Sequence, residues 1–369
     1  MALHTYMSEG VDTAVIECGI GGEHDSTNIL VNPTVTGITS LGIDHVAMLG
    51  GTIEEIAWHK AGIMKTGAPA FTVPQPEAAM TVLRQRAHEK GADLHLIDRH
   101  PQLDTIKLGL AADFQKTNAS LAIAIAAAHL RALGHTDLPT DPTTAPLPPR
   151  FITGLEHVQW PGRCETRREP NVTWYIDGGH TLESVDVAAK WFASQISVDK
   201  PPVPDTASSH KPRPKSILIF NQQTRDAAAL ARALHRTLAD ALDDRSPFAH
   251  AIFCANVTFK EQGFRPDLVS VNTNAADVQA LSVQRGLAGV WAEIDKVAEV
   301  SVVGSIEEAV GVVRGLVGRE GDGGERGERD EGGDGEVRVL VTGSVHLVGG
   351  FLEVLESGQG EGSGVGGSA

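Results

Sequence analysis

Three side chains near the amino terminus have the types and spacing that could hold a metal ion. Glu17 follows a short apolar run, and His45 and Lys60 lie fifteen residues apart in a later segment. A carboxylate and an imidazole are common metal ligands, whereas an ammonium group is not. A neutral amine can react with carbon dioxide to give a carbamate, which has the charge and shape of a carboxylate. Glu17, His45 and a carbamylated Lys60 could therefore hold a hard divalent ion such as Mg²⁺.

The predicted place of Lys60 on a helix supports that chemistry. Thr52 and Glu55 form a capping-box pattern, so a helix is predicted to begin there. On a 3.6-residue period, Lys60 shares one face with the apolar residues Ile53, Ile56, Ala57 and Met64. Burial of an amine favours its neutral, reactive form. The alternative is that Lys60 extends its ammonium group to solvent past the end of this apolar face.

Two predicted strands would position these residues. An apolar strand is expected to end at Ile16, which puts Glu17 at its carboxyl end, where open α/β sheets bind their ligands. The three glycines within residues 19–22 then allow a sharp turn. A second strand is predicted over residues 34–40, ahead of His45.

Residues 15–30, VIECGIGGEHDSTNIL, resemble the second signature segment of the folylpolyglutamate synthases. The matched positions are two apolar residues, then Glu17, Gly19, an aliphatic residue, Gly21, Gly22, Asp25, Thr27 and two aliphatic residues. The family is a branch of the Mur-ligase-like ATP-dependent amide ligases. In that family the residues that match Glu17, His45 and Lys60 hold magnesium, the lysine as its carbamate. The resemblance therefore implies the same metal site that the residue types suggest.

Two further segments resemble nucleotide-binding parts of the family. Residues 113–130 match a buried helix, which implies that Gln115 and Asn118 lie near the nucleotide base. From the residues alone, Asn118 would be the cap of that helix. The WPGR segment at 160–163 resembles the start of the carboxy-terminal domain, in which the arginine reaches the ATP phosphates. The planar guanidinium of Arg163 suits that role.

The segment WYIDGGHTLES predicts a strand that delivers Asp177 and His180 into a glycine turn ahead of a helix. The resemblance implies that both serve the ribose and phosphate region, and we predict Asp177, His180 and Lys60 as catalytic residues. Bacterial members commonly have alanine and asparagine where this chain has Gly179 and Thr181. Without the resemblance, Asp177 would be a turn residue that stabilises its own backbone.

The pattern of elements predicts two α/β domains. We expect a partial Mur-ligase-like central ATPase domain over residues 1–149, with a mostly parallel sheet and helices on both faces. A Rossmann-like α/β domain is expected over 150–357. It contains inserts near 199–215 and 318–336 whose composition predicts disorder, and 358–369 is predicted to be a flexible tail.

One motif of the family is not found in this sequence. Members hold ATP with a glycine-rich loop that ends in Gly-Lys followed by Ser or Thr, and this chain has no Gly-Lys dipeptide. The backbone amides of such a loop cradle the phosphates and its lysine neutralises their charge. We interpret the chain as a family member that lacks its amino-terminal phosphate-loop region, and we expect impaired activity.

The activity implied by the resemblance is ATP-dependent addition of L-glutamate to the γ-carboxylate of a folyl- or tetrahydrofolyl-(poly)glutamate through an acyl phosphate. ATP, Mg²⁺, folate polyglutamate and L-glutamate are the implied partners, and a monovalent cation is a further candidate. Two alternatives stay open: a dihydrofolate synthase, which shares the motifs, and an inactive remnant that still binds folate or nucleotide. A nicotinamide-dependent oxidoreductase is disfavoured because GIGGEHD lacks the GxGxxG spacing.

Composition argues against several other classes of protein. The net charge of −16 disfavours nucleic acid as a partner. The three cysteines are odd in number and widely spaced, which argues against a disulfide framework or a zinc site. The sequence contains no apolar span long enough to suggest a membrane segment. We expect a monomer in the cytoplasm, with a mitochondrial pool as the alternative.

Overall fold

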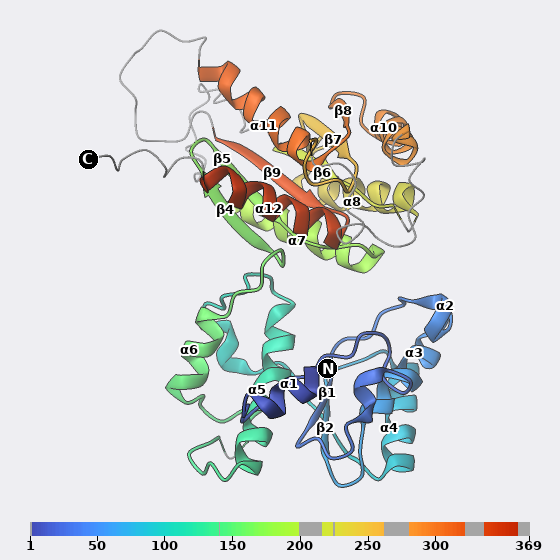
Figure 1. Cartoon of the computed structure of the whole chain (residues 1–369), viewed down its shortest axis with the longest axis vertical. Coiled ribbons are helices and arrows are strands. Elements are labelled where there is room, and N and C mark those ends of the chain that lie inside the picture. Colours follow the sequence, from blue (N-terminus) through green and yellow to red (C-terminus); the bar gives the residue numbers. More distant parts are fainter. Residues whose placement is uncertain are drawn as a thin grey trace, which may run out of the picture. The chain divides into compact units, whose positions relative to one another are not determined.

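The computed structural model of the chain (Figure 1) describes residues 2–139, 141–198, 216–223, 226–261, 280–321 and 336–360. The chain forms two compact units, unit 1 over residues 1–158 and unit 2 over 159–369. The domain boundary predicted between residues 149 and 150 stays a prediction. In the part of the chain that the structure describes, no helix is long and apolar enough to span a membrane.

The predicted disordered segments lie mostly outside the described residues. The whole insert near 199–215 is in that group. Helix α11 (Ile306–Gly321) includes the first residues of the insert near 318–336, and α12 (Val345–Gly360) includes the first residues of the tail. The rest of both segments is outside the described residues.

Unit 1 contains a parallel sheet in the order β1, β2, β3. The strands are β1 (Thr36–Ile38), β2 (Pro69–Thr72) and β3 (Asp93–Leu96). In this register Thr36 pairs with Ala70, and Pro69 pairs with Asp93. The helices of this unit are α1 (Ala2–Ser8), η1 (Ser26–Ile29), α2 (Val46–Leu49), α3 (Ile53–Lys60), η2 (Ala61–Ile63), α4 (Glu77–Lys90), η3 (Pro101–Asp104), α5 (Gln115–Ala132) and α6 (Pro149–His157).

Apolar side chains cover both faces of this sheet. Ala70 and Phe71 are successive residues of β2, so their side chains point to opposite faces. Ala70 belongs to the cluster formed with α3 and α4, which includes Leu83. Phe71 belongs to a second cluster, which includes Leu121 of α5. Unit 1 therefore has the predicted arrangement of a parallel sheet with helices on both faces.

The sequence predicted two of the three local elements around the proposed metal ligands Glu17, His45 and Lys60. The strand expected over 34–40 is β1, and the helix expected from Thr52 is α3. The strand expected to end at Ile16 is wrong, because residues 12–18 form no strand and Val15 is 93% exposed. A strand exists only where its amides and carbonyls pair with a neighbouring strand, and β1, which lies at the sheet edge, has β2 alone as a described partner.

We expect Thr52→Ala to lower the free energy of unfolding of unit 1 by about 1 kcal/mol. The Thr52 hydroxyl accepts the Glu55 amide at 3.2 Å, while the Glu55 carboxylate accepts the Thr52 amide at 3.1 Å. Alanine removes the first of these bonds. Urea unfolding followed by circular dichroism measures the change. Thr81→Ala makes the same substitution on the exposed face of α4 and should cost nothing, because alanine favours a helix; an equal loss in both variants would contradict the capping role.

Unit 2 contains a six-stranded sheet in the order β4, β5, β9, β6, β7, β8 (Figure 1). The strands are β4 (Glu165–Glu169), β5 (Val172–Ile176), β6 (Ser216–Phe220), β7 (His250–Cys254), β8 (Glu299–Val303) and β9 (Val337–Thr342). Only β4 runs antiparallel to its neighbour. The helices are α7 (Leu182–Val198), α8 (Ala227–Leu242), α10 (Ser282–Ile294), α11 and α12. This is the Rossmann-like architecture that the sequence predicted.

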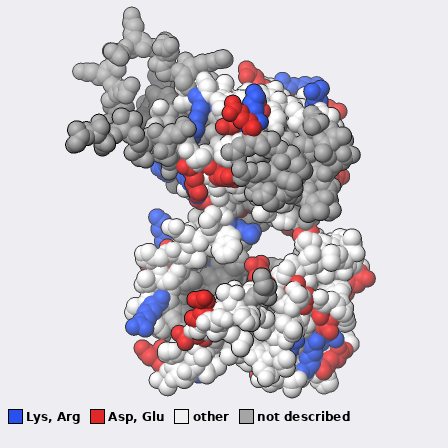
Figure 2. Space-filling model, in the orientation of Figure 1, with Lys and Arg blue, Asp and Glu red and all other residues white. Residues whose placement is uncertain are grey.

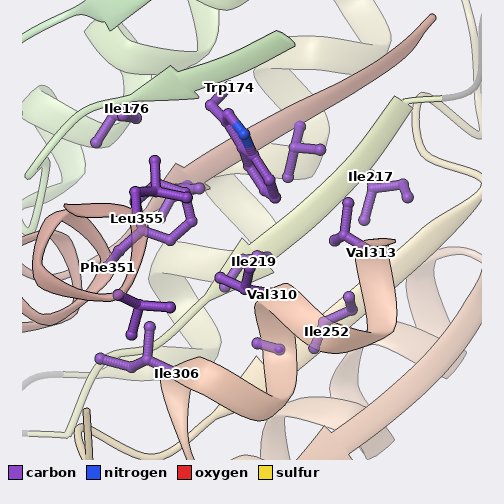
Figure 3. Packing of buried hydrophobic residues seen from close by; sticks show 14 of the residues in the cluster. Trp174, Ile176, Ile217, Ile219, Ile252, Ile306, Val310, Val313, Phe351 and Leu355 are labelled. Carbon is purple, nitrogen blue, oxygen red and sulfur yellow. The ribbon is translucent and has the colours of Figure 1, made fainter. Parts of the chain in front are cut away.

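Helices also cover both faces of the unit 2 sheet. On one face, Trp174 of β5 meets Phe351 of α12 with ring centroids 5.1 Å apart, within the cluster in Figure 3 that also holds residues of α11. On the other face, Tyr175 contacts Phe192 of α7 at 5.2 Å, and Phe253 contacts Trp291 of α10 at 6.0 Å. Burial of both faces explains why β5, β6 and β7 are apolar at nearly every position.

The strand order creates a switch point beside β9. β9 is the last strand in the chain, yet it lies between β5 and β6. The helix after β9, α12, packs on the face that holds Trp174, whereas α7, which follows β5, packs on the face that holds Tyr175. Neighbouring strands whose chains leave toward opposite faces form a switch point, where ligands bind beyond the carboxyl ends. The loops that follow β5, β6 and β9 are therefore the candidate ligand-binding edge of unit 2.

Charged side chains are interspersed on the surface. Figure 2 shows acidic and basic residues at several places on one face of each unit. In α4, Arg84 pairs with Glu77 at 3.1 Å and Arg86 pairs with Glu89 at 2.9 Å. The exposed Arg84–Glu77 pair contributes little to stability because solvent screens it, whereas the Arg86 side chain is only 12% exposed.

Candidate functional site

The carboxyl edge of the unit 2 sheet holds a buried carboxylate. Asp177 follows β5 directly and is 4% exposed. One of its oxygens accepts the backbone amide of Cys164 at 2.9 Å and the Cys164 thiol at 3.2 Å. The other accepts the amide of Gly179 at 2.8 Å. Burial raises the pKa of Asp177 above its ordinary value, although these hydrogen bonds and the nearby charge of Arg163 oppose that rise.

Two turns dock against each other around this carboxylate. The amide of Gly178 donates to the carbonyl of Gly162 at 2.9 Å, which joins the turn after β5 to the turn that contains WPGR. The amide of Gly162 donates to the Glu165 carboxylate at 2.7 Å. Arg163 is exposed in the second turn. The structure thus brings Arg163 and Asp177 to one edge of unit 2.

His180 lies in the same glycine turn. It is half-buried, and its Nδ1 lies 2.9 Å from the carbonyl of Gly178. The hydroxyl of Ser184 accepts the backbone amides of His180 and Thr181, each at 2.9 Å. This serine therefore fixes the end of the turn where α7 begins.

Asp177 leads to a prediction about pH. Its folded pKa lies above its unfolded value of about 3.9. The stability that it contributes is then fully present below about pH 4 and is lost as the pH rises through the folded pKa, because the buried carboxylate must ionise. Asp177→Asn should remove this loss, as seen in urea unfolding across a pH series. Asp240→Asn on the exposed side of α8 is the control and should keep the wild-type slope.

A pair of buried amides lies at the same edge and was missed in the sequence. Asn221 follows β6 and Asn256 follows β7 closely; the Asn221 side chain donates to the Asn256 side chain at 2.9 Å. Gln222 donates to the carbonyl of Gly343 beyond β9 at 2.9 Å. The signal was present, because a polar residue interrupts each apolar run as the strand ends. The network links three strand ends and rigidifies the edge.

In unit 1, Asp25 organises the glycine loop of the signature segment. Its carboxylate accepts the amide of Ile20 at 2.8 Å, the amide of Thr27 at 2.9 Å and the hydroxyl of Thr27 at 2.6 Å. These bonds, led by the Thr27 hydroxyl, lower the pKa of Asp25 to about 2. The aspartate and threonine of the signature therefore hold the loop in shape.

This loop packs against the end of α3, where Lys60 lies. The amide of Glu23 donates to the carbonyl of His59 at 2.7 Å. A Cβ added to Gly62 would lie 2.3 Å from the Cα of Glu23, and one added to Gly22 would lie 2.7 Å from the carbonyl oxygen of His59. Only glycines permit so close an approach between the two backbones. The contact holds the signature loop beside the residues around Lys60.

The three predicted metal ligands occupy different local settings. Glu17 is exposed in the segment without a strand. His45 precedes α2 with a left-handed backbone, φ 52°, and its Nε2 lies 3.8 Å from Asp44. Lys60 is the last residue of α3 and is half-buried. Among the described residues, its ammonium group has no ion pair or hydrogen bond.

The carboxylate of Glu17 and a carbamate on Lys60 are donors suited to a hard divalent cation, whereas the imidazole of His45 is an unusual ligand for Mg²⁺. In the described parts of the chain, no three His, Cys, Asp or Glu side chains cluster so as to hold a metal ion. The predicted set has two such residues, Glu17 and His45, and takes its third ligand from Lys60. The half-buried Lys60 amine without an anionic partner suits this modification, because a carbamate replaces a cation by an anion.

Gln115 and Asn118 are adjacent on α5. The Asn118 amide donates to the Gln115 side-chain oxygen at 2.9 Å. The prediction that Asn118 caps this helix is wrong, because α5 begins at Gln115 and its N-cap residue, Phe114, supplies no side-chain bond. The backbone already turns at Ala112, whose carbonyl accepts the amide of Gln115, so Asn118 lies one turn inside the helix.

Comparisons with known proteins identify the relatives of the chain. No protein-family model matches it. Among solved structures, the folylpolyglutamate synthase of Mycobacterium tuberculosis complexed with ADP superposes with a TM-score of 0.66 at 23% identity, covering 96% of this chain and 70% of that one. Escherichia coli FolC in complex with DHPP and ADP gives 0.57 at 21% identity, covering 93% and 66%. The chain has the two-part α/β fold of the Mur-ligase-like proteins.

Relatives found by sequence comparison have a higher identity to this chain than these solved structures do. The chain is 44% identical over 357 residues to the folylpolyglutamate synthase of Neurospora crassa, covering 96% of this chain and 63% of that protein. It is 41% identical over 363 residues to that of Saccharomyces cerevisiae strain YJM789, covering 96% and 60%. The chain is therefore homologous to the folylpolyglutamate synthases, which are ligases, and spans less than two thirds of their length. The resemblance seen in the sequence is confirmed.

Proposed function

We propose that this chain acts as an ATP-dependent amide ligase that adds L-glutamate to the γ-carboxylate of a folyl- or tetrahydrofolyl-(poly)glutamate. The observation that carries the proposal is its 44% identity to a folylpolyglutamate synthase across 96% of its length. The site in unit 2 supports it, because a buried carboxylate and an exposed arginine meet at a switch point of the sheet.

The reaction has two steps. An oxygen of the folate γ-carboxylate attacks the γ-phosphorus of ATP, and ADP leaves, which gives an acyl phosphate. The amine of glutamate then attacks the acyl carbon, phosphate leaves, and the new amide loses a proton. The guanidinium of Arg163 is suited to stabilise charge on the transferring phosphoryl group. Asp177 holds the turns on which Arg163 and His180 lie.

The residues of unit 1 complete the proposal. Glu17, His45 and the carbamate of Lys60 would hold Mg²⁺. When bound, the ion would neutralise charge on the phosphates. Gln115 and Asn118, paired on α5, would contact the nucleotide base through their side-chain amides, which can both donate and accept hydrogen bonds.

A direct assay tests the activity. The purified chain is incubated with ATP, Mg²⁺, L-glutamate and tetrahydrofolyl-monoglutamate, and products are separated by mass spectrometry. We expect a product longer by one glutamate that requires ATP. A parallel reaction with dihydropteroate tests the dihydrofolate synthase alternative. A product from dihydropteroate alone would overturn the proposed acceptor.

An inactive protein that still binds nucleotide is the second candidate. Calorimetric titration with ATP separates the candidates. ATP binding without any glutamate product would support the binding protein. No heat on ATP addition, together with no product, would exclude both.

A further inference from the structure

The thiol of Cys164 has an unusual place in unit 2. Cys164 is 3% exposed, and its backbone is left-handed, with φ 46°. Its amide and its thiol both donate to the same oxygen of Asp177, at 2.9 and 3.2 Å. We propose that Cys164 is a positioning residue whose thiol holds the Asp177 carboxylate and thereby fixes the turn that carries Arg163. The catalytic meaning of this role rests on the function proposed above.

The geometry gives the thiol a defined task. One Asp177 oxygen is occupied by Gly179 of its own turn, at 2.8 Å. The other oxygen faces the preceding turn and accepts the amide and the thiol of Cys164. The Asp177 carboxylate thus links the turn before β4 to the turn after β5. Because Arg163 directly precedes Cys164, the hydrogen bonds between Cys164 and Asp177 fix the backbone position of Arg163.

Electrostatics explain why a thiol suits this place. Burial raises the pKa of Cys164 above its ordinary value, so the sulfur keeps its proton and remains a donor. The charged or titratable groups around the Asp177 carboxylate are Arg163, Glu165 and His180, from the two turns and the start of β4. From α12, the uncharged side chains of Val345, Val348 and Leu352 lie near the two turns. The thiol therefore matters most when Asp177 is ionised, since a donor stabilises a buried anion more than a neutral acid.

The role can be tested by a double-mutant cycle between Cys164→Ala and Asp177→Asn. Unfolding in urea is followed by fluorescence of the buried Trp174 region from about pH 4 to about pH 8. In the presence of Asp177, Cys164→Ala should lower the folding equilibrium constant about tenfold at the upper end of this range and less at the lower end. In the Asp177→Asn background, the cost should no longer depend on pH.

Cys164→Ser is the matched control, because a hydroxyl keeps a donor at the same place. It should restore most of the loss at high pH. A thiol that only fills space would give an equal cost at every pH in both backgrounds, without recovery by serine. That pattern would overturn the proposal.

A spectroscopic measurement covers the case in which the variants fold poorly. The infrared S–H stretching band of Cys164 should lie below that of an unbonded thiol, and Asp177→Asn should change it. Variants Cys18→Ser and Cys254→Ala assign the band among the three free cysteines. A band at the frequency of an unbonded thiol in the wild-type chain would refute the contact. No substrate enters either measurement, so a failed ligase assay leaves these results interpretable, and their failure leaves the ligase function untouched.

Discussion

Replacing Lys60 by alanine is expected to lower the rate of ATP-dependent glutamate addition by about 10²- to 10³-fold, the usual effect of removing a group that stabilises transferring charge. The reason is the loss of the carbamate that we propose as a ligand for Mg²⁺. The Lys60 side chain is half-buried at the end of α3 without an anionic partner among the described residues. The mass-spectrometric assay described above measures the rate.

Two additions make this result specific. Short carboxylic acids should restore part of the activity, because they supply the missing carboxylate. Lys107→Ala removes an exposed lysine of unit 1 and should leave the rate unchanged. An unaltered rate in Lys60→Ala would refute the metal role.

The carbamate can also be observed without turnover. Chain equilibrated with ¹³C-bicarbonate should show a carbamate carbon signal by NMR that Lys60→Ala removes and Lys107→Ala keeps. Detection of this signal would show that the amine is modified even if the chain proves inactive. A spectrum without the carbamate signal would support the alternative, in which the ammonium group of Lys60 extends to solvent.

Lys60 shows how far periodicity can predict an environment. The spacing placed it on the apolar face of α3, and its neighbours Ile56 and Ala57 are fully buried. Lys60 itself is only half-buried, because α3 ends there and η2 begins. The sequence predicted the face correctly, but the depth of burial depends on where the helix ends and on what packs beyond it.

Local patterns predicted the elements that are stabilised locally. The capping box of Thr52 and the strand before Asp177 were both correct, because caps and short continuous apolar runs act over a few residues. The strand expected to end at Ile16 failed because pairing is not a local property. Its apolar residues are suited to a sheet, yet β1 has no described neighbour on its other edge.

The site residues divide in the same way. Asp177, His180 and Arg163 were predicted because their segments, WYIDGGHTLES and WPGR, resemble family segments. Cys164 and Asn221 were not, because their importance comes from partners distant in the sequence: Asp177 for the thiol and Asn256 for the amide. The polar residue that ends the apolar run marks Asn221 as unusual, but neither side chain shows in the sequence which partner it has. Only the fold shows that the turns before β4 and after β5 meet.

The close approach of the Gly62 backbone to Glu23, near Lys60, leads to the second prediction of a large effect. We expect Gly62→Ala to lower the free energy of unfolding of unit 1 by about 3 kcal/mol, the upper part of the usual range for overpacking. The new Cβ would lie 2.3 Å from the Cα and 2.4 Å from the amide nitrogen of Glu23, so backbone must move. Glu23 also pairs with Arg86 at 2.6 Å and with Lys90 at 3.0 Å, which ties the signature loop to α4 and limits that movement.

Gly154→Ala is the matched control for this substitution. Gly154 lies in α6 with open space around it, so the same added methyl group should stabilise unit 1 by about 0.5 to 1 kcal/mol through helix propensity. Urea unfolding of both variants, followed by circular dichroism, compares them directly. Because Gly62 and Gly22 together seat the signature loop on the end of α3, Gly62→Ala should also weaken the ¹³C carbamate signal of Lys60. Equal stability of the two variants would show that the loop yields easily and that its contact with α3 does not fix the surroundings of Lys60.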